Sequence, residues 1–141
     1  MSPIFHVVED GPSLVAPYSH VVEVDDWLFV TGQLATGVDD TSPLPAGIED
    51  QTRKVMENLR IVLHGVGANL ADAVQVRIFL THFERDYDAM NAIYRDYFDS
   101  NKLPARTTVG VTALARGGLI EIDMIAKRSE GHNRHFLDAG Y

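Results

Sequence analysis

Two segments near the N-terminus are rich in β-branched and aromatic residues, and only Asp25 and Asp26 separate them. Residues 21–24 and 27–31 therefore predict a β-hairpin closed by a two-residue turn. The first 20 residues hold three of the six prolines and predict extended chain. Residues 33–47 combine Gly, Pro, Ser, Thr and Asp, which predicts a loop, and loops of that length are often functional.

The spacing of the apolar positions then changes. In residues 48–66 apolar side chains recur at intervals of three and four, with charged side chains on the other side, which predicts an amphipathic helix. Gly65 and Gly67 supply a C-terminal stop for this helix. Residues 74–81 alternate between apolar and other side chains, and they predict a strand with one buried face.

The C-terminal half carries a second helix and two further strands. Asp86 is a candidate cap for the helix, and Pro104 lies beyond its end. Residues 106–113 predict a strand, residues 117–118 a turn, and residues 119–127 a last strand. The predicted order is therefore β-hairpin, helix, strand, helix, β-hairpin. Its simplest packing is an α+β fold in which two helices cover one face of one sheet.

The sheet face turned away from the helices is expected to be mixed in character. Arg106, Thr108 and Gly110 share one parity, and we expect them on this face together with Glu121 and Asp123. A face that is half apolar and half charged suits neither solvent nor a core, but it suits a subunit interface that contains polar pockets. The pattern therefore predicts a homo-oligomer.

The composition mainly excludes functions. With 141 residues, 45% hydrophobic and 23% charged, the chain is typical of one globular domain rather than of a disordered protein. It contains no cysteine, which removes disulfides, thiolate metal sites and cysteine nucleophiles. The net charge of −8 argues against nucleic acids and anionic membranes as partners. Neither a secretory signal nor an apolar stretch of membrane-spanning length is present, so we expect a cytoplasmic protein.

Arg106 and Glu121 form the strongest candidate pair for chemistry, because each interrupts a segment that otherwise predicts strand interior. A guanidinium can bind a carboxylate with two parallel hydrogen bonds, and a carboxylate can orient or deprotonate a water. Together they suit a small anionic substrate that water attacks. The alternative is a structural salt bridge between neighbouring strands.

Other candidates carry weaker signals. Asn91 lies inside the second helix, where its amide either binds a ligand or is solvated, and Tyr18 lies in extended chain. Thr31 and Gly32 close the hairpin, where glycine permits close approach of a ligand or forms a plain turn. His132 and His135 lack a third ligand at a suitable spacing, so we expect no metal site. Motifs for nucleotide cofactors or serine hydrolases are absent from the sequence.

Four of these segments, in this order, resemble the Rid (reactive intermediate deaminase, or YjgF) family. They are VTGQ at 30–33, NAIY at 91–94, LPARTTVGV at 103–111 and IEIDMIAKR at 120–128, and the resemblance spans roughly residues 18–128. It implies a chorismate-mutase-like α+β fold, a mixed sheet, and a homotrimer with a central barrel and clefts between subunits. On this basis residues 1–128 form one Rid-type domain and residues 129–141 form a C-terminal extension.

The resemblance also implies a reaction without metal or organic cofactor. Members of the family hydrolyse enamines and imines, such as 2-aminoacrylate, to 2-oxo acids and ammonia. By analogy Arg106 would bind the substrate carboxylate and Glu121 would position the attacking water. The substrate-binding residues would be Tyr18, Thr31, Gly32, Asn91 and Thr108.

This chain departs from the family pattern around the expected pocket. Thr108 stands where Cys is common, Thr31 replaces a common Ser, and the C-terminal tail is longer than usual. These departures bear on the substrate more than on the reaction type. The alternatives are a 2-aminomuconate-type deaminase of aromatic degradation, a non-catalytic module that binds small carboxylates, and a chaperone-like or RNA-acting protein.

Overall fold

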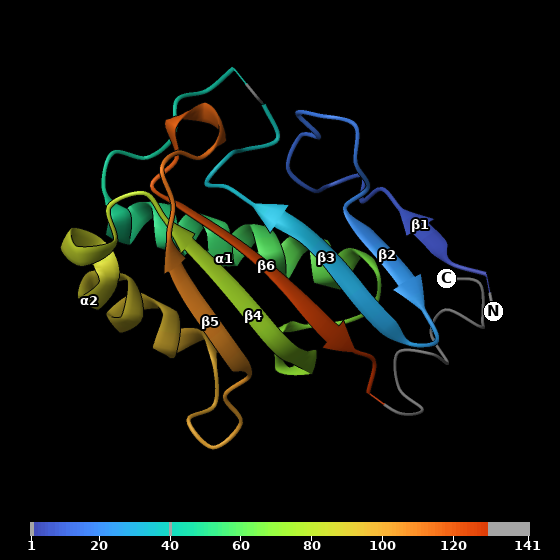
Figure 1. The fold of residues 1–141 in the computed structure, drawn as a ribbon. Helices are drawn as coiled ribbons and strands as arrows, with labels where there is room; N and C mark the ends of the chain where they lie inside the picture. The colour runs from blue at the N-terminus through green and yellow to red at the C-terminus, as the bar shows by residue number, and fades with distance from the viewer. Residues whose placement is uncertain (1, 40, 130–141) are drawn as a thin grey trace.

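Six strands form one mixed sheet in the order β1-β2-β3-β6-β4-β5 (Figure 1). The computed structural model describes residues 2–39 and 41–129. All neighbouring strands are antiparallel except β4 and β5, which are parallel. The strands are β1 (Ile4–His6), β2 (Val21–Val24), β3 (Trp27–Gln33), β4 (Ala73–Leu80), β5 (Ala105–Gly110) and β6 (Ile120–Lys127).

The N-terminal hairpin is confirmed. Asp25 and Asp26 have φ angles of 50° and 71°, and a two-residue turn with both central residues in the left-handed region matches the twist of the strands. Aspartate tolerates this region better than most residues do. The extended chain before the hairpin contains β1, which pairs with β2.

Two helices lie on one face of the sheet, as predicted (Figure 1). They are α1 (Ile48–Gly65) and α2 (Phe83–Tyr94), and short 3-10 turns follow as η1 (Leu70–Asp72), η2 (Arg95–Tyr97) and η3 (Ala115–Gly117). The predicted apolar face of α1 is fully buried at Val55, Leu59 and Leu63. The chain leaves α1 through Gly67, whose φ of 78° favours glycine. Among the described residues, no helix has the length and apolar character needed to cross a bilayer.

The start of α2 differs from the prediction. Only two residues separate β4 from Phe83, so the chain enters the helix earlier than Asp86. Asp86 lies within the first turn, where its N–H donates to the carbonyl of His82 at 3.0 Å. Its buried carboxylate accepts hydrogen bonds from Arg85 at 2.8 and 3.1 Å. The prediction of Asp86 as the cap was therefore wrong.

The predicted C-terminal hairpin is also wrong. β5 lies at the edge of the sheet and pairs with β4, whereas β6 inserts between β3 and β4. The inward side chains of β6 explain its central position, because Ile120, Ile122, Met124 and Ala126 are all buried. A strand with such a face is covered best at the centre of the sheet, and η3 lies in the connection that carries the chain there (Figure 1).

The faces of β5 are reversed relative to the prediction. Arg106, Thr108 and Gly110 lie on the helix side, because β5 runs parallel to β4 and pairs them with Val76, Ile78 and Leu80. These three β4 residues are fully buried under the helices. A Cβ built on Gly110 would meet Cβ of Phe83 in α2 at 3.2 Å, which agrees with this orientation.

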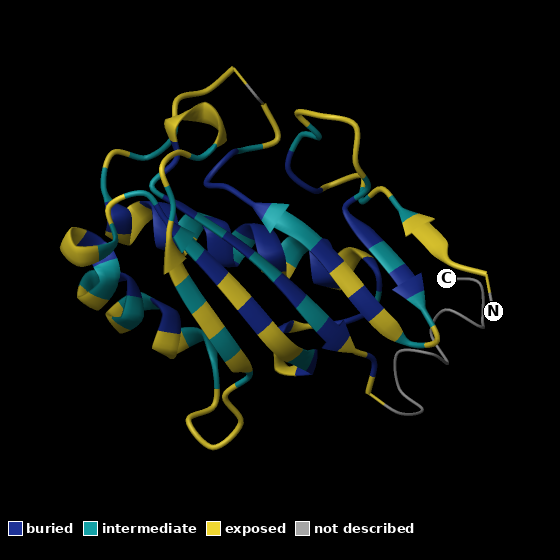
Figure 2. Ribbon diagram, viewed as in Figure 1, coloured by how far each residue is buried: buried dark blue, intermediate teal, exposed yellow. Residues whose placement is uncertain are grey.

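The outer sheet face carries alternating side chains from the three strands β4, β5 and β6. Figure 2 shows the striping of exposed and buried positions that this alternation produces. The residues on the face are Arg77, Phe79, Thr107, Val109, Glu121, Asp123 and Ile125. Glu121 and Asp123 lie there as predicted, so the face is mixed even without Arg106.

Candidate functional site

Arg106 lies on β5 against side chains of α2. We call this group the Arg106 site (Tyr87, Asn91, Tyr94, Arg106 and Thr108). Its guanidinium carbon lies 5.0 Å from the centroid of the Tyr94 ring and 6.0 Å from that of Tyr87. Its Nη2 donates a long hydrogen bond of 3.4 Å to the Tyr87 hydroxyl. Among the described residues Arg106 has no carboxylate partner. The aromatic rings therefore hold a cation whose hydrogen-bonding fork remains available.

Unpartnered polar atoms gather in the same place. Within the described part of the chain, the buried side-chain polar atoms without a hydrogen-bond partner are Asn91 Oδ1, the Tyr94 hydroxyl and Thr108 Oγ1. Burial raises the pKa of Tyr94 to about 12, although the charge of Arg106 opposes the shift. Leaving such an atom unpaired costs roughly 1–3 kcal/mol, so a cluster of them points to a ligand or a partner that is bound there.

Glu121 lies on the opposite sheet face, in what we call the Glu121 site (Thr31, Gly32, Glu121 and Asp123). Burial raises the pKa of the Glu121 carboxyl, and the negative charge of Asp123 raises it further. Asp123 itself is paired with Arg77 through hydrogen bonds of 2.9 and 2.6 Å. A carboxylate with a raised pKa holds a proton more readily than a free carboxylate, which suits a group that accepts and returns a proton.

Tyr18 belongs to the chain segment beside Thr31, because the N–H of Thr31 donates to the carbonyl of His20 at 3.0 Å. Its side chain is partly exposed. The predicted residues thus separate into two groups. Arg106, Asn91 and Thr108 lie on the helix side of the β5 edge, and the others lie around the end of β3 and the start of β6.

The alternative interpretation of Arg106 and Glu121 as a salt bridge between neighbouring strands is wrong within one chain. β4 lies between β5 and β6, and the two side chains point to opposite faces of the sheet. Since no ion pair within the described chain uses either residue, both charges remain available for other partners.

Sequence reasoning missed the two tyrosines that flank Arg106. Tyr87, Asn91 and Tyr94 are spaced at i, i+4 and i+7, which places them on one helix face. The signal was present in the spacing, but an aromatic residue at such a position more often serves the core than a site. Only the position of β5 beside α2 shows which cation these rings meet.

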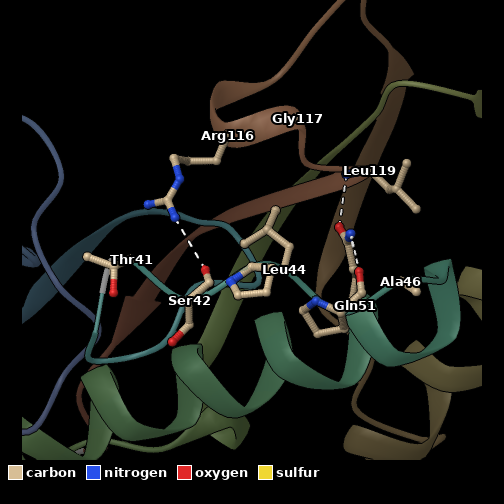
Figure 3. Close-up of a pocket in the computed structure, with 10 residues that line it drawn as sticks. Thr41, Ser42, Leu44, Ala46, Gln51, Arg116, Gly117 and Leu119 are labelled. Atoms are coloured by element: carbon tan, nitrogen blue, oxygen red, sulfur yellow. Dashed lines mark hydrogen bonds between the residues drawn. The ribbon is translucent and has the colours of Figure 1, made fainter.

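A separate cavity of about 490 Å³ lies between residues 41–46 and η3 (Figure 3). Arg116 and Ser42 both line it, and Arg116 donates to the carbonyl of Ser42 at 3.3 Å. Gln51 binds the carbonyl of Pro45 at 2.7 Å and the N–H of Leu119 at 2.9 Å, so its amide is satisfied. None of the predicted site residues lines this cavity. The hydrogen bonds from Arg116 and Gln51 indicate that the residues around it hold the 41–46 loop in place.

The described residues contain no group of three or more His, Asp or Glu side chains placed to hold a metal ion. His132 and His135 lie outside the described residues. The polar groups at the two sites are an arginine, two tyrosines, an amide, two hydroxyls and carboxylates. These groups suit binding of a small organic anion.

A family model described as Endoribonuclease L-PSP matches residues 8–128 of the chain. The chain belongs to this family, the Rid family. A RutC family protein of Saccharolobus solfataricus is 40% identical to this Rid protein over 121 residues, covering 86% of this chain and 94% of the relative. A protein of Dermatophagoides farinae named 2-iminobutanoate/2-iminopropanoate deaminase is 32% identical over 115 residues, covering 82% and 88%.

Solved structures agree with the α+β fold of this Rid protein. YyfA of Yersinia pestis, described as a Rid protein of unknown function, has a TM-score of 0.81 at 36% identity, covering 90% of this chain and 100% of YyfA. TdcF of E. coli, solved with bound serine, has a TM-score of 0.79 at 28% identity, covering 87% and 98%.

Proposed function

We propose that this Rid protein is a deaminase that hydrolyses carboxylate-bearing enamines and imines, of the 2-aminoacrylate and 2-iminopropionate type, to 2-oxo acids and ammonia. The observation that carries the proposal is the Arg106 site. A partly buried guanidinium rests on two tyrosine rings, lacks a carboxylate partner, and has unpartnered polar atoms around it. A small carboxylate would satisfy the cation with paired hydrogen bonds.

In this mechanism an enamine substrate first tautomerises to the imine, as a proton leaves nitrogen and another is added at the terminal carbon. Arg106 holds the substrate carboxylate, and Glu121 accepts a proton from the water that attacks the imine carbon. A C–O bond forms, and the electron pair of the C=N bond moves to nitrogen, which takes up a proton. The carbinolamine then collapses: its hydroxyl proton passes to nitrogen, a C=O bond forms as the C–N bond breaks, and ammonia leaves the 2-oxo acid. An imine carbon is already electrophilic, so a placed water and a proton carrier supply what the step needs.

The two sites lie on opposite faces of one sheet, so the mechanism requires a second copy of the chain. We propose a homotrimer in which the three sheets pack into a central barrel. The Arg106 site of one subunit then meets the Glu121 site of its neighbour. Exposed apolar side chains on the outer face support this arrangement, including Phe29, which is 46% exposed, and Val109, which is 40% exposed.

The relatives support the reaction class. Curated relatives at 30–32% identity carry the name 2-iminobutanoate/2-iminopropanoate deaminase, and serine in TdcF is a small molecule with a carboxylate. We further propose that the enzyme acts in the cytoplasm. The proposed reaction uses no metal or organic cofactor and involves no nucleic acid or membrane partner. Residues 129–141 would be an extension outside the catalytic domain.

The decisive assay generates 2-iminopropionate with an amino-acid oxidase and follows its loss by semicarbazide trapping. Wild type should accelerate the loss, whereas Arg106→Ala should not. Arg53→Ala is a matched control, since it removes an exposed arginine that is paired with Asp50 and is not part of either candidate site. Full activity in Arg106→Ala, or no acceleration of any imine by wild type, would refute the proposal. Saturable binding of 2-oxo acids without turnover would instead indicate a binding module.

A 2-aminomuconate-type substrate is the second candidate. It is favoured by the unpartnered Asn91 Oδ1, Tyr94 hydroxyl and Thr108 Oγ1, which offer more polar contacts than a three-carbon substrate uses. Including this dicarboxylate in the same assay, with wild type and with a chain truncated after Arg128, separates the two. Tight, salt-sensitive binding of RNA would contradict both, because the net charge of −8 disfavours it.

A further inference from the structure

We propose that Gly32 is a positioning residue for Glu121. The bulge at Thr31 and Gly32 and the missing side chain of Gly32 together make the space in which the Glu121 carboxylate rests against β3. The inference rests on the proposed function only in taking Glu121 as the group that positions the attacking water. Its structural content concerns where that carboxylate lies.

The space above Gly32 is filled by Glu121. A Cβ built on Gly32 would lie 2.9 Å from Cδ and 3.2 Å from Cγ of Glu121, and closer still to Oε2. Real Cβ atoms essentially never approach other heavy atoms below 3.0 Å. Any side chain at position 32 must therefore push the Glu121 carboxylate away from its place.

The backbone brings the two residues together through a bulge. Val30 pairs with Met124 and Gln33 pairs with Ile122, so Thr31 and Gly32 of β3 together face the single residue Asp123 of β6. Two residues opposite one define a β-bulge, which redirects side chains and occurs frequently beside active sites. Here the extra residue brings the β3 backbone alongside the start of β6, where Glu121 lies.

Backbone conformation does not require glycine at position 32. Among the described residues the glycines with positive φ are Gly67 and Gly117. Alanine would therefore suffer no backbone strain at position 32, and its methyl group would meet only the flexible end of a glutamate. The role of the glycine is accordingly to leave room for the carboxylate rather than to permit a turn.

The surroundings of Glu121 determine what its displacement would change. Asp123 is the next residue of β6 on the same face as Glu121. Across on β4, Glu121 faces Phe79, with Arg77 one pair further along and bonded to Asp123. From β3 it meets Gly32, and Asp123 and Arg77 are the charged groups among these neighbours. Burial is the first cause of its raised pKa, so movement toward solvent should bring that pKa down toward 4.5.

The test compares Gly32→Ala with a second crowded glycine, Gly65. A Cβ on Gly65 would lie 3.0 Å from Cγ2 of Val8, and closer still to Cγ1. Valine is stiff, so Gly65→Ala should lower the melting temperature by several degrees while leaving Glu121 unchanged. Gly32→Ala should instead affect Glu121 and leave the stability of the fold almost unchanged. We expect little change in melting temperature, a lower pKa of Glu121 in a ¹³C-carboxylate NMR titration, and kcat reduced about 10–100-fold with little change in KM.

A double variant supplies the rescue. Glu121→Asp shortens the side chain and withdraws it from position 32, so its added cost to kcat should be smaller in the Gly32→Ala background than in wild type. Glu121→Gln assigns the NMR signal. An unchanged titration of Glu121 in Gly32→Ala would overturn the inference, as would additive effects of the two substitutions.

The two proposals fail in distinguishable ways. If wild type hydrolyses no imine, the proposed function fails, and the titration of Glu121 in Gly32→Ala still decides whether Gly32 positions it. If wild type is active but Gly32→Ala matches it in kcat and titration, only the positioning role fails.

Discussion

Arg106 and Arg128 are two arginines of the same chain in opposite situations. Arg128 follows β6, its side chain is 1% exposed, and it donates to both carboxylate oxygens of Glu23 at 3.0 and 2.9 Å. It also donates to the carbonyl of Gly67 at 3.4 Å. Arg106 contacts two tyrosine rings and donates one long hydrogen bond. The first cation is satisfied by the fold, whereas the second has capacity for a ligand.

Two carboxylates, Glu23 and Glu121, show the same contrast between a paired and an unpaired charge. The hydrogen bond from Arg128 holds the pKa of Glu23 below its usual range, and the hydrogen bond from His6 adds to this effect against the cost of burial. Burial raises the pKa of Glu121, to which no cation among the described residues is bonded. The comparison teaches that residue type and burial do not identify a site by themselves. Unmet hydrogen-bonding capacity does.

The largest expected effect comes from Arg128→Met. In the part of the chain that the structure describes, it leaves the buried carboxylate of Glu23 with His6 as its one side-chain partner. Breaking a buried ion pair costs about 3–5 kcal/mol. Urea denaturation should show a loss of that size in the free energy of unfolding. A loss below about 1 kcal/mol would remove the contrast between the two arginines.

Arg106→Met should reduce kcat/KM for an imine about 100-fold or more, because charge-assisted hydrogen bonds to the substrate contribute about 1.5–3 kcal/mol each. The free energy of unfolding should change by less than about 1 kcal/mol, the size of a partly exposed cation–π contact. The imine assay and urea denaturation are run on the same preparations. Arg106→Lys, which keeps the charge without the planar fork, should restore activity only in part.

Glu23→Gln should lower the free energy of unfolding by about 2 kcal/mol at pH 7, since it weakens charge-assisted hydrogen bonds. The pKa of Glu23 is lowered in the folded state, so its contribution is complete above pH 4.5 and disappears as the pH falls through the folded-state pKa. The difference between wild type and variant should therefore shrink on acidification. A constant difference would show that packing, not charge, is lost.

Tyr94→Phe removes a buried hydroxyl without a partner, so the isolated chain should gain about 1 kcal/mol in unfolding free energy. If that hydroxyl contacts substrate as proposed, kcat/KM should fall at the same time. Tyr87→Phe is the control, since its hydroxyl accepts the bond from Arg106 and its loss should not stabilise. A destabilised Tyr94→Phe would mean that the hydroxyl is satisfied in solution.

The smallest effect is expected from Glu121→Gln, which should gain up to about 0.5 kcal/mol in stability at pH 7. The folded state raises the pKa of Glu121, so ionisation opposes folding above that pKa and has no effect below pH 4.5, where the group is neutral in both states. The gain in stability should therefore vanish on acidification. The substitution itself should abolish the proposed deaminase activity, which the imine assay measures. The sign of this stability change is opposite to that of Glu23→Gln, and equal signs would contradict the comparison.

Several sequence predictions that depend only on near neighbours in the chain were confirmed. The Asp25–Asp26 hairpin, the apolar face of α1 and the inward face of β6 follow from turn chemistry and periodicity, which depend only on near neighbours. Errors arose where a non-local partner decides. Asp86 lies within α2 because β4 ends close to it, and β5 and β6 are not a hairpin because β6 is covered best at the sheet centre.

The sequence by itself singled out Arg106 and Glu121 as candidates for chemistry, because each interrupts a segment that otherwise predicts strand interior. It also determined that Arg106 and Thr108 share one side of β5, since strand side chains alternate. Only the tertiary structure decided which side that is, through the parallel pairing of β5 with β4. It thereby placed Arg106 on the tyrosines of α2 and Glu121 against Gly32 on the opposite face, because alternation specifies relative orientation and packing specifies direction.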